Sequence, residues 1–341
     1  MPTIKDVAKE AGVSIATVSY VLNNKIDAVS EDTRQEVWRA VEKIGYMPNV
    51  TARNLRSSRS RLIGYAWHEQ PRSAMNPVLH NFTYFLAQAA EAAGYHLLTF
   101  TFPSSDPIPV YDELIRTGRV DGFIVASTVT DDPRVRYLLD RDFPFVAFGR
   151  ANADWDFAWV DTDGEAGFAE GVNTLRAFGH ERIAMIAYDS GSLAGNFRVS
   201  GYVSAMRAAG LPIPEHFIWR GTHDDHTGRE AVNYWCSLPA DQRPTAILAV
   251  SDMIAIGVCD QARRCGIQVG RELSVIGFDN MPLTQYLQPS MSTFEQPLEE
   301  IGRACVEMLC TLLAKQTLDA HERTLLLPPR LILRDSVGTA L

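Results

Sequence analysis

Residues 14–23, which read SIATVSYVLN, combine a polar helix start with one apolar face and one face of small or hydrogen-bonding side chains. Ser14 can cap a helix by accepting a hydrogen bond from a backbone N–H. Val18, Val21 and Leu22 then recur at helical spacing on one face. The other face carries small, methyl-bearing or hydrogen-bonding groups: Ile15, Ala16, Thr17, Ser19 and Tyr20. Such groups suit a helix that enters the major groove of DNA.

Two more helices are expected around this one. Val7 and Ala8 give an earlier helix an apolar face, and Gly12 supplies the tight turn because it reaches positive φ without steric cost. Ser30 caps a third helix that ends at Gly45. Its expected buried stripe is Val37, Trp38, Val41 and Ile44. Residues 1–47 therefore predict a helix-turn-helix DNA-binding head.

Charge supports this interpretation once the chain is divided. The whole chain has a net charge of −9, yet residues 1–61 hold ten Lys and Arg against seven Asp and Glu. Arg53, Arg56, Arg59 and Arg61 lie in a stretch without carboxylates, as expected of a head that contacts phosphates. The alternative is a solvated basic linker. Residues 48–61 are read as a hinge segment, too short to be a stable helix alone, followed by a linker.

Length and composition bound the remaining possibilities. A chain of 341 residues predicts two or three domains, and no apolar run approaches the roughly 20 residues of a membrane span. The first residues do not read as a secretory signal. The five cysteines form no CxxC pair, so we expect reduced thiols in a cytoplasmic protein and no metal site.

From Leu62 onward, strand-like and helix-like patterns alternate, which predicts parallel sheets covered by helices on both faces. The expected strands are 62–67, 96–102, 122–126, 145–148, 183–187, 246–250 and 274–278, and the expected helices are 82–93, 166–178, 199–209, 254–265 and 298–313. Their number fits an α/β body of two doubly wound subdomains. Ligands of such sheets bind at the carboxyl ends of the strands, in a cleft.

The chain resembles the lac/galactose repressor family over essentially its whole length. The resemblance rests on DVA, AGVS, TVS and VLN within residues 6–23, and on VDGFI at 120–124, GHERIA at 179–184, RVSGY at 198–202 and SVIGFDN at 274–280. It implies a homodimer whose body, residues 62–341, has the periplasmic-binding-protein fold. The N-subdomain is expected at about 62–161 and 294–322, and the C-subdomain at about 162–293 and 323–341. The three crossings are expected near Asp161–Asp163, Ser290–Phe294 and Glu322–Leu327.

The resemblance also assigns DNA contacts. These are Thr3, Ser14, Ile15, Ala16, Thr17, Ser19, Tyr20 and Asn23 in the head, and Ala52, Arg53 and Leu55 in a hinge helix. Leu55 would wedge into the minor groove and kink the duplex, with packing on the head as the alternative. Ile15 and Ala16 can touch thymine methyls but cannot make the bidentate hydrogen bonds of the polar residues found in several relatives. The operator half-site therefore stays open.

An effector pocket is implied in the body. Arg198 would clamp a ligand's polar edge, or else form a salt bridge between the subdomains. Asp279 would accept hydrogen bonds from vicinal hydroxyls, or else cap a helix. Ser251 ends a strand where relatives often have Asn, and Gly149 replaces an Asp and leaves room for a larger ligand. His223 occupies the place of a stacking aromatic, although a metal site with His226 and the intervening aspartates is an alternative to a polar loop.

Aromatic side chains favour a sugar as the effector, because their faces stack on sugar C–H groups. Trp67, Trp155, Trp159 and Trp219 are expected near the cleft, although core packing could explain at least two of them. The full predicted effector set is Trp67, His68, Asn76, Arg150, Arg198, Trp219, His223, Ser251 and Asp279.

Two classes of regulator remain open. One is a repressor of carbohydrate-utilisation genes that a sugar releases from its operator; the other is a corepressor-type regulator whose DNA binding is strengthened by a nucleobase or phosphosugar. No nucleophile elbow, P-loop or dinucleotide fingerprint is present in the sequence, so neither an enzyme nor a cofactor is expected.

Overall fold

The computed structural model describes residues 2–22, 29–46, 59–68, 77–103 and 105–340. The chain divides into two compact units, a head, Met1–Ser60, and a body, Arg61–Leu341. None of the described helices combines the length and the apolar character that a bilayer crossing requires.

The head is built from α1 (Ile4–Glu10), α2 (Ile15–Leu22) and α3 (Glu31–Ile44). Val7, Val18 and Val37, one from each helix, are fully buried against one another. Ser14 caps α2 by accepting a hydrogen bond from the backbone N–H of Thr17 at 3.0 Å. The three predicted helices are therefore present in the described residues.

Trp38 was expected in the buried stripe of α3, and this expectation is wrong, because its side chain is 43% exposed. Successive helical residues point about 100° apart, so Val37 and Trp38 cannot both lie at the centre of one face. Val37 takes the core position, with Ala40 and Val41 beside it.

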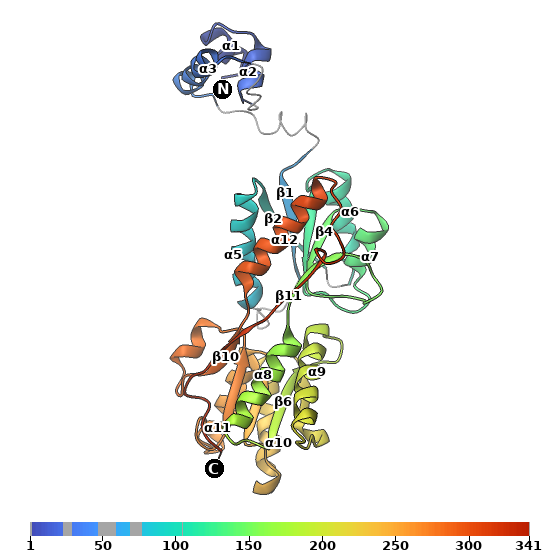
Figure 1. The fold of residues 1–341 in the computed structure, drawn as a ribbon, viewed down its shortest axis with the longest axis vertical. Helices are drawn as coiled ribbons and strands as arrows, with labels where there is room; N and C mark the ends of the chain where they lie inside the picture. Colours follow the sequence, from blue (N-terminus) through green and yellow to red (C-terminus); the bar gives the residue numbers. More distant parts are fainter. Residues whose placement is uncertain (1, 23–28, 47–58, 69–76, 104, 341) are drawn as a thin grey trace. The chain divides into compact units, whose positions relative to one another are not determined.

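The N-subdomain of the body is a six-stranded parallel sheet in the order β11-β5-β4-β3-β1-β2. Its strands are β1 (Leu62–His68), β2 (His96–Phe102), β3 (Gly122–Ala126), β4 (Phe145–Phe148), β5 (Ala158–Thr162) and β11 (Thr324–Leu327). Helices α5 (Pro77–Ala92) and α12 (Leu298–Leu313) cover one face, and α6 (Ile108–Arg116) and α7 (Pro133–Asp140) cover the other (Figure 1).

The C-subdomain is a second six-stranded sheet in the order β12-β10-β9-β8-β6-β7, parallel except for β12. Its strands are β6 (Ile183–Tyr188), β7 (Ile218–Gly221), β8 (Ala246–Ala249), β9 (Ser274–Phe278), β10 (Ser292–Glu295) and β12 (Arg330–Ile332). Its helices are α8 (Gly164–Ala177), α9 (Leu193–Ala208), α10 (Asp225–Ser237) and α11 (Asp252–Arg264), with short 3₁₀ turns η3 (Glu215–Phe217), η4 (Ala240–Gln242) and η5 (Pro282–Tyr286).

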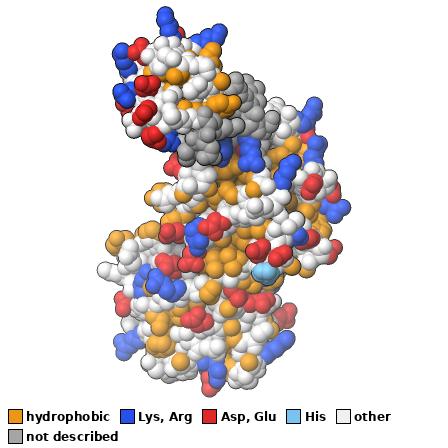
Figure 2. All heavy atoms as spheres, turned by 45° about the horizontal axis from the view of Figure 1, so that its top comes forward, with side chains coloured by type: hydrophobic (Ala, Val, Ile, Leu, Met, Phe, Trp, Pro, Cys, Tyr) orange, Lys and Arg blue, Asp and Glu red, His pale blue; other side chains and the backbone are white. Residues whose placement is uncertain are grey.

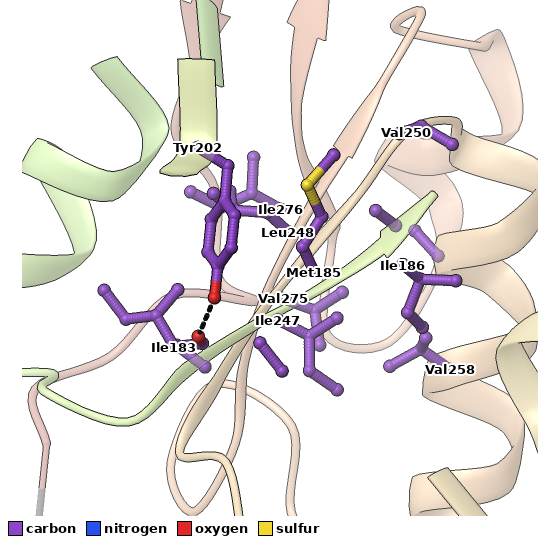
Figure 3. Close-up of a cluster of buried hydrophobic side chains, with 14 of the residues drawn as sticks. Ile183, Met185, Ile186, Tyr202, Ile247, Leu248, Val250, Val258, Val275 and Ile276 are labelled. Carbon is purple, nitrogen blue, oxygen red and sulfur yellow. Dashed lines mark hydrogen bonds between the residues drawn. The ribbon is translucent and has the colours of Figure 1, made fainter. Parts of the chain in front are cut away.

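Helices on both faces explain why the central strands are uninterrupted apolar runs. Ile183, Met185 and Ile186 of β6 are all fully buried, although successive side chains alternate between faces. Figure 3 shows this core, in which the hydroxyl of Tyr202 donates to the backbone carbonyl of Ile183 at 2.8 Å.

Three segments connect the subdomains. The chain leaves β5 of the first sheet for α8 at Asp163, and it leaves β10 of the second sheet for α12 at Gln296 and Pro297. It returns at Pro328 and Pro329, between β11 and β12. The last two crossings lie after the predicted segments, because Thr324–Leu327 pairs with β5 and β10 continues to Glu295.

A close approach of α8 and α9 fixes the position of Arg198. A Cβ placed on Gly201 would lie 2.1 Å from the backbone oxygen of Glu165, so only glycine lets the two helices meet there. One turn earlier on α9, Arg198 lies against Gly164.

We predict that Gly201→Ala lowers the free energy of unfolding of the body by about 1–3 kcal/mol, because the backbone must shift to admit the methyl group. Gly191→Ala is the matched control, since a Cβ there meets nothing within 4 Å. Urea unfolding followed by tryptophan fluorescence measures both. Equal losses in the two variants would contradict the packing argument.

Candidate functional site

The outer face of α2 is exposed as the sequence analysis expects. Ile15 and Tyr20 are 44% and 41% exposed, and Ala16 lies exposed beside them. Ser14 caps α2 by accepting from the backbone N–H of Thr17, and Thr3 is the N-cap residue of α1, where its backbone N–H donates to the Asp6 carboxylate. The other predicted DNA contacts, Asn23, Ala52, Arg53 and Leu55, lie outside the described residues.

A cavity of about 490 Å³ lies between the two subdomains of the body. Its walls come from the carboxyl ends of strands in both sheets and from the first turns of α9. This is where ligands of open α/β sheets bind. Of the predicted effector contacts, Arg150, Arg198, His223 and Asp279 line this cavity.

Arg198 is held in the floor of the cavity, only 7% exposed. One terminal nitrogen of its guanidinium donates to the backbone carbonyl of Val250, and the guanidinium carbon lies 3.9 Å from the centre of the Phe278 ring. Within the described residues no carboxylate lies within ion-pair distance of Arg198, so the structure does not support a salt bridge between the subdomains.

Asp279 follows β9 and accepts a hydrogen bond from the side-chain amide of Gln296 at 2.7 Å. Burial raises the pKa of Asp279 to about 8, the charge of Arg198 acts in the opposite direction, and Asp252 adds to the rise. Met281, not Asp279, caps η5. Asp279 therefore does not cap this turn, so the alternative to ligand binding given in the sequence analysis is not supported.

Gln296 links two crossings, and sequence reasoning missed it. Its side-chain oxygen accepts from the hydroxyl of Thr162 at 2.7 Å, while its nitrogen donates to Asp279. Thr162 ends β5 at the first crossing and Gln296 lies in the second. The two residues are 134 positions apart, so no local sequence pattern brings them together.

Arg150 forms a second contact between the subdomains. Its Nε donates to Asp161 at 2.9 Å, and its guanidinium stacks 3.3 Å above the ring of Phe197 on α9. Burial raises the pKa of Asp161, and Arg150 opposes that rise. Asp161 and Phe197 were not among the predicted site residues.

His223 lines the cavity with its ring edge-to-face against Tyr188, at 5.0 Å between ring centres. Its Nε2 is buried and has no hydrogen-bond partner among the described residues. Burial, aided by Arg198, lowers the pKa of His223 to about 4, so the ring is neutral near pH 7. Gly149 also lines the cavity; its φ of 116° and the nearby Thr128 hydroxyl leave no place for a side chain.

Three predicted effector contacts are not among the residues that line the cavity. Trp67 packs edge-to-face on His80 in the N-subdomain, and Trp219 packs on Tyr234 at 5.5 Å in the C-subdomain. Ser251 is fully buried and caps α11 by accepting from the N–H of Ile254. Helix capping and core packing thus replace the predicted ligand contacts. The side chain of His68 and all of Asn76 lie outside the described residues.

Comparisons with known proteins agree with this architecture. Residues 3–49 match the model described as bacterial regulatory proteins, lacI family, and residues 172–337 match a periplasmic binding protein-like domain. The HTH-type transcriptional repressor PurR of Photorhabdus laumondii subsp. laumondii is 31% identical over 99% of this chain and 97% of its own length. The chain belongs to the lacI family.

Solved structures of family members support the same assignment. A LacI-family regulatory protein from Chloroflexus aggregans is 42% identical, with a TM-score of 0.78 over 82% of this chain and 99% of its own. The transcriptional regulator CelR in complex with cellobiose is 27% identical, with a TM-score of 0.74 over 98% of this chain and all of its own. The predicted family and fold class are confirmed. The chain is a DNA-binding transcriptional repressor, and its relatives are regulators rather than enzymes.

The raised pKa of Asp279 predicts a pH-dependent stability. The unfolded carboxyl releases its proton near pH 4, whereas the folded one keeps it up to about pH 8. The stability from this group is therefore full below pH 4 and is lost as the pH rises through 8. Asp279→Asn removes the effect, so the wild type should lose at least about 1.4 kcal/mol relative to this variant between pH 5 and 8.

Urea unfolding at several pH values measures this difference. Asp154→Asn, which changes an exposed carboxylate of the N-subdomain, is the control and should show a constant difference from wild type. A constant difference for Asp279→Asn as well would mean that Asp279 ionises normally in the folded protein.

Proposed function

We propose that this repressor is released from its operator by a neutral sugar, of about disaccharide size, bound in the cavity between the subdomains. The observation that carries the proposal is how few charges in the cavity lack a partner. Arg150 is neutralised by Asp161, which leaves Arg198 as the one lining arginine without a carboxylate partner among the described residues. A neutral polyhydroxy ligand can exchange hydrogen bonds with such groups without introducing an uncompensated charge.

The same pairing argues against a phosphosugar. A phosphate brings close to two negative charges and requires cations that are free to meet it. Of the two arginines that line the cavity, Arg150 is paired with Asp161, so only Arg198 is left to meet a phosphate. The solved CelR complex with cellobiose, at 27% identity, is consistent with a disaccharide.

A nucleobase corepressor is the second candidate. The relatives named PurR, at 30–31% identity over nearly the whole chain, favour it. A planar base stacks best on a broad aromatic face, and the ring at the stacking position of this chain is the smaller imidazole of His223, which already packs edge-to-face against Tyr188. For this reason we place the sugar first.

The proposed switch is a difference in affinity. A ligand in the cavity shifts the angle between the subdomains only if it binds one arrangement better than the other. Such a ligand would rearrange two contacts: that of Arg150 with Phe197, which joins the subdomains, and that of Gln296, in a crossing segment, with Asp279. The hinge segment would pass the change to the DNA.

We predict that Arg198→Ala keeps operator affinity but weakens the ligand response about ten- to a hundredfold, the equivalent of a lost charged hydrogen bond of roughly 1.5–3 kcal/mol. Arg207→Ala, an exposed change near the end of the same helix, is the control. The measurement is fluorescence anisotropy of a labelled operator, selected from a randomised duplex pool, titrated with cellobiose and other neutral disaccharides and with hypoxanthine. If hypoxanthine changes the affinity of the protein for its operator in either direction and the disaccharides do not, the nucleobase candidate is favoured.

Base reading is assigned to the exposed face of α2. Ile15→Ala should weaken the binding free energy for the specific operator by roughly 1 kcal/mol or more, because the contact with a thymine methyl is lost. Its binding to a scrambled duplex should be unchanged. Lys43→Ala serves as the control, because this lysine pairs with Glu10 between α1 and α3. Equal losses on both duplexes would place Ile15 outside the base-reading set.

We further propose a homodimer formed by the body. Leu283 and Tyr286 of η5 are 51% and 75% exposed. The side chain of Arg334 donates a hydrogen bond to the Thr284 hydroxyl of this turn, and Leu333, which precedes Arg334 in the sequence, is also exposed. Figure 2 shows hydrophobic side chains over a broad area of the visible face of the body. One head per chain also fits a palindromic operator with two half-sites.

Tyr286→Asp should raise the dimer dissociation constant at least tenfold, because it places a charge in an apolar contact. Sedimentation velocity over a concentration series measures it. Tyr234→Asp, on α10, is the control. An unchanged dissociation constant in Tyr286→Asp would exclude this surface from the dimer contact.

A further inference from the structure

A second cavity lies in the C-subdomain, away from the cleft. It has a volume of about 260 Å³ and lies at the amino ends of β6, β8 and β9, between the end of α10 and the loop 267–273. The effector cavity is at the carboxyl ends of the same sheet, so the two cavities are on opposite edges.

The inner wall of the second cavity is apolar and flat. Trp235 is almost completely buried, with its indole nitrogen already donating to the carbonyl of His216. Ile247 and Leu273 lie beside it. His180 presents a ring whose nitrogens are both engaged, one with Thr245 and the other with Ser274 and the carbonyl of Gly338, and whose pKa is lowered by burial. This wall offers no unpaired charge to a ligand.

The rim, by contrast, is cationic. Arg182, Arg243 and Arg271 line the cavity, and among the described residues none of them has a carboxylate within ion-pair distance. Most other arginines of the described body are paired with Asp or Glu, as Arg229, Arg263 and Arg264 are with Asp260. The Nε atoms of Arg182 and Arg243 donate to backbone carbonyls at 2.8 and 2.7 Å, which orients both forks.

Three uncompensated guanidinium groups in a chain of net charge −9 require explanation. The one acidic residue among those that line the cavity, Glu272, accepts from the backbone N–H of Gln268 and forms no ion pair with any of the three arginines. The terminal nitrogens of the rim arginines therefore remain available as donors to an anion, and guanidinium forks suit the planar geometry of carboxylates and related oxyanions.

We propose that this cavity is a second ligand site, which takes a small aromatic acid with its rings against Trp235 and its anionic group on the arginine rim. The site is independent of the effector cavity, so the proposal does not rest on the sugar assignment.

The probes are a matched pair, 8-anilinonaphthalene-1-sulfonate and N-phenyl-1-naphthylamine, which share the rings and differ by the sulfonate. Their fluorescence enhancement, and energy transfer from tryptophan, report binding to the full chain. The double variant Arg182→Gln/Arg271→Gln should bind the sulfonate probe about tenfold more weakly than the wild type and should bind the neutral probe with unchanged affinity. Arg263→Gln/Arg264→Gln, with the same loss of charge on α11, should change neither.

Ile267→Trp, which fills the cavity, tests the location and should abolish binding of both probes at micromolar concentration, while cellobiose should not compete. The proposal fails if the sulfonate probe binds equally to the two arginine double variants, or if Ile267→Trp retains it. Competition by cellobiose would place the probe in the effector cavity and would also overturn the proposal.

Discussion

A buried carboxyl group must be protonated, paired or hydrogen-bonded, and this constraint organises the cleft of the body. Asp279 is satisfied by Gln296, whose other end is bonded to Thr162, and Asp161 is satisfied by Arg150. Each of these bonds includes a residue at or beside one of the crossings between the subdomains. The relative position of the two sheets and the polarity of the cavity are therefore set by the same few groups.

This arrangement gives an effector a direct means of action. A sugar hydroxyl that bonds to Asp279 competes with Gln296, and one that reaches Arg150 competes with Asp161 or alters its stacking on Phe197. Because packed subdomains have discrete arrangements, small changes at these contacts can select between two positions of the body. The coupling to DNA is then a free-energy difference shared by two sites, which makes it reciprocal.

The sequence predicts those parts of the molecule that local pattern determines. Gly122–Ala126 and Phe145–Phe148 match the predicted strands because both faces of a central parallel strand are buried. Strands β5, β10, β11 and β12 escaped prediction, because they are only three to five residues long and most include polar side chains, so they lack a long apolar run. Arg198 and Asp279 were found through family motifs. Gln296 was missed, and Trp67 and Trp219 were placed in the cleft, because residue type does not encode which way a side chain points.

We propose that the cavity ligand and the operator compete through the conformation of the body, and calorimetry can measure this competition. Titration of cellobiose into the protein, free and saturated with its selected operator, yields two dissociation constants. We expect weaker sugar binding in the operator complex, by the same factor by which saturating sugar weakens operator binding. If cellobiose binds measurably and its dissociation constant is the same for the free protein and for the operator complex, the proposed competition is wrong.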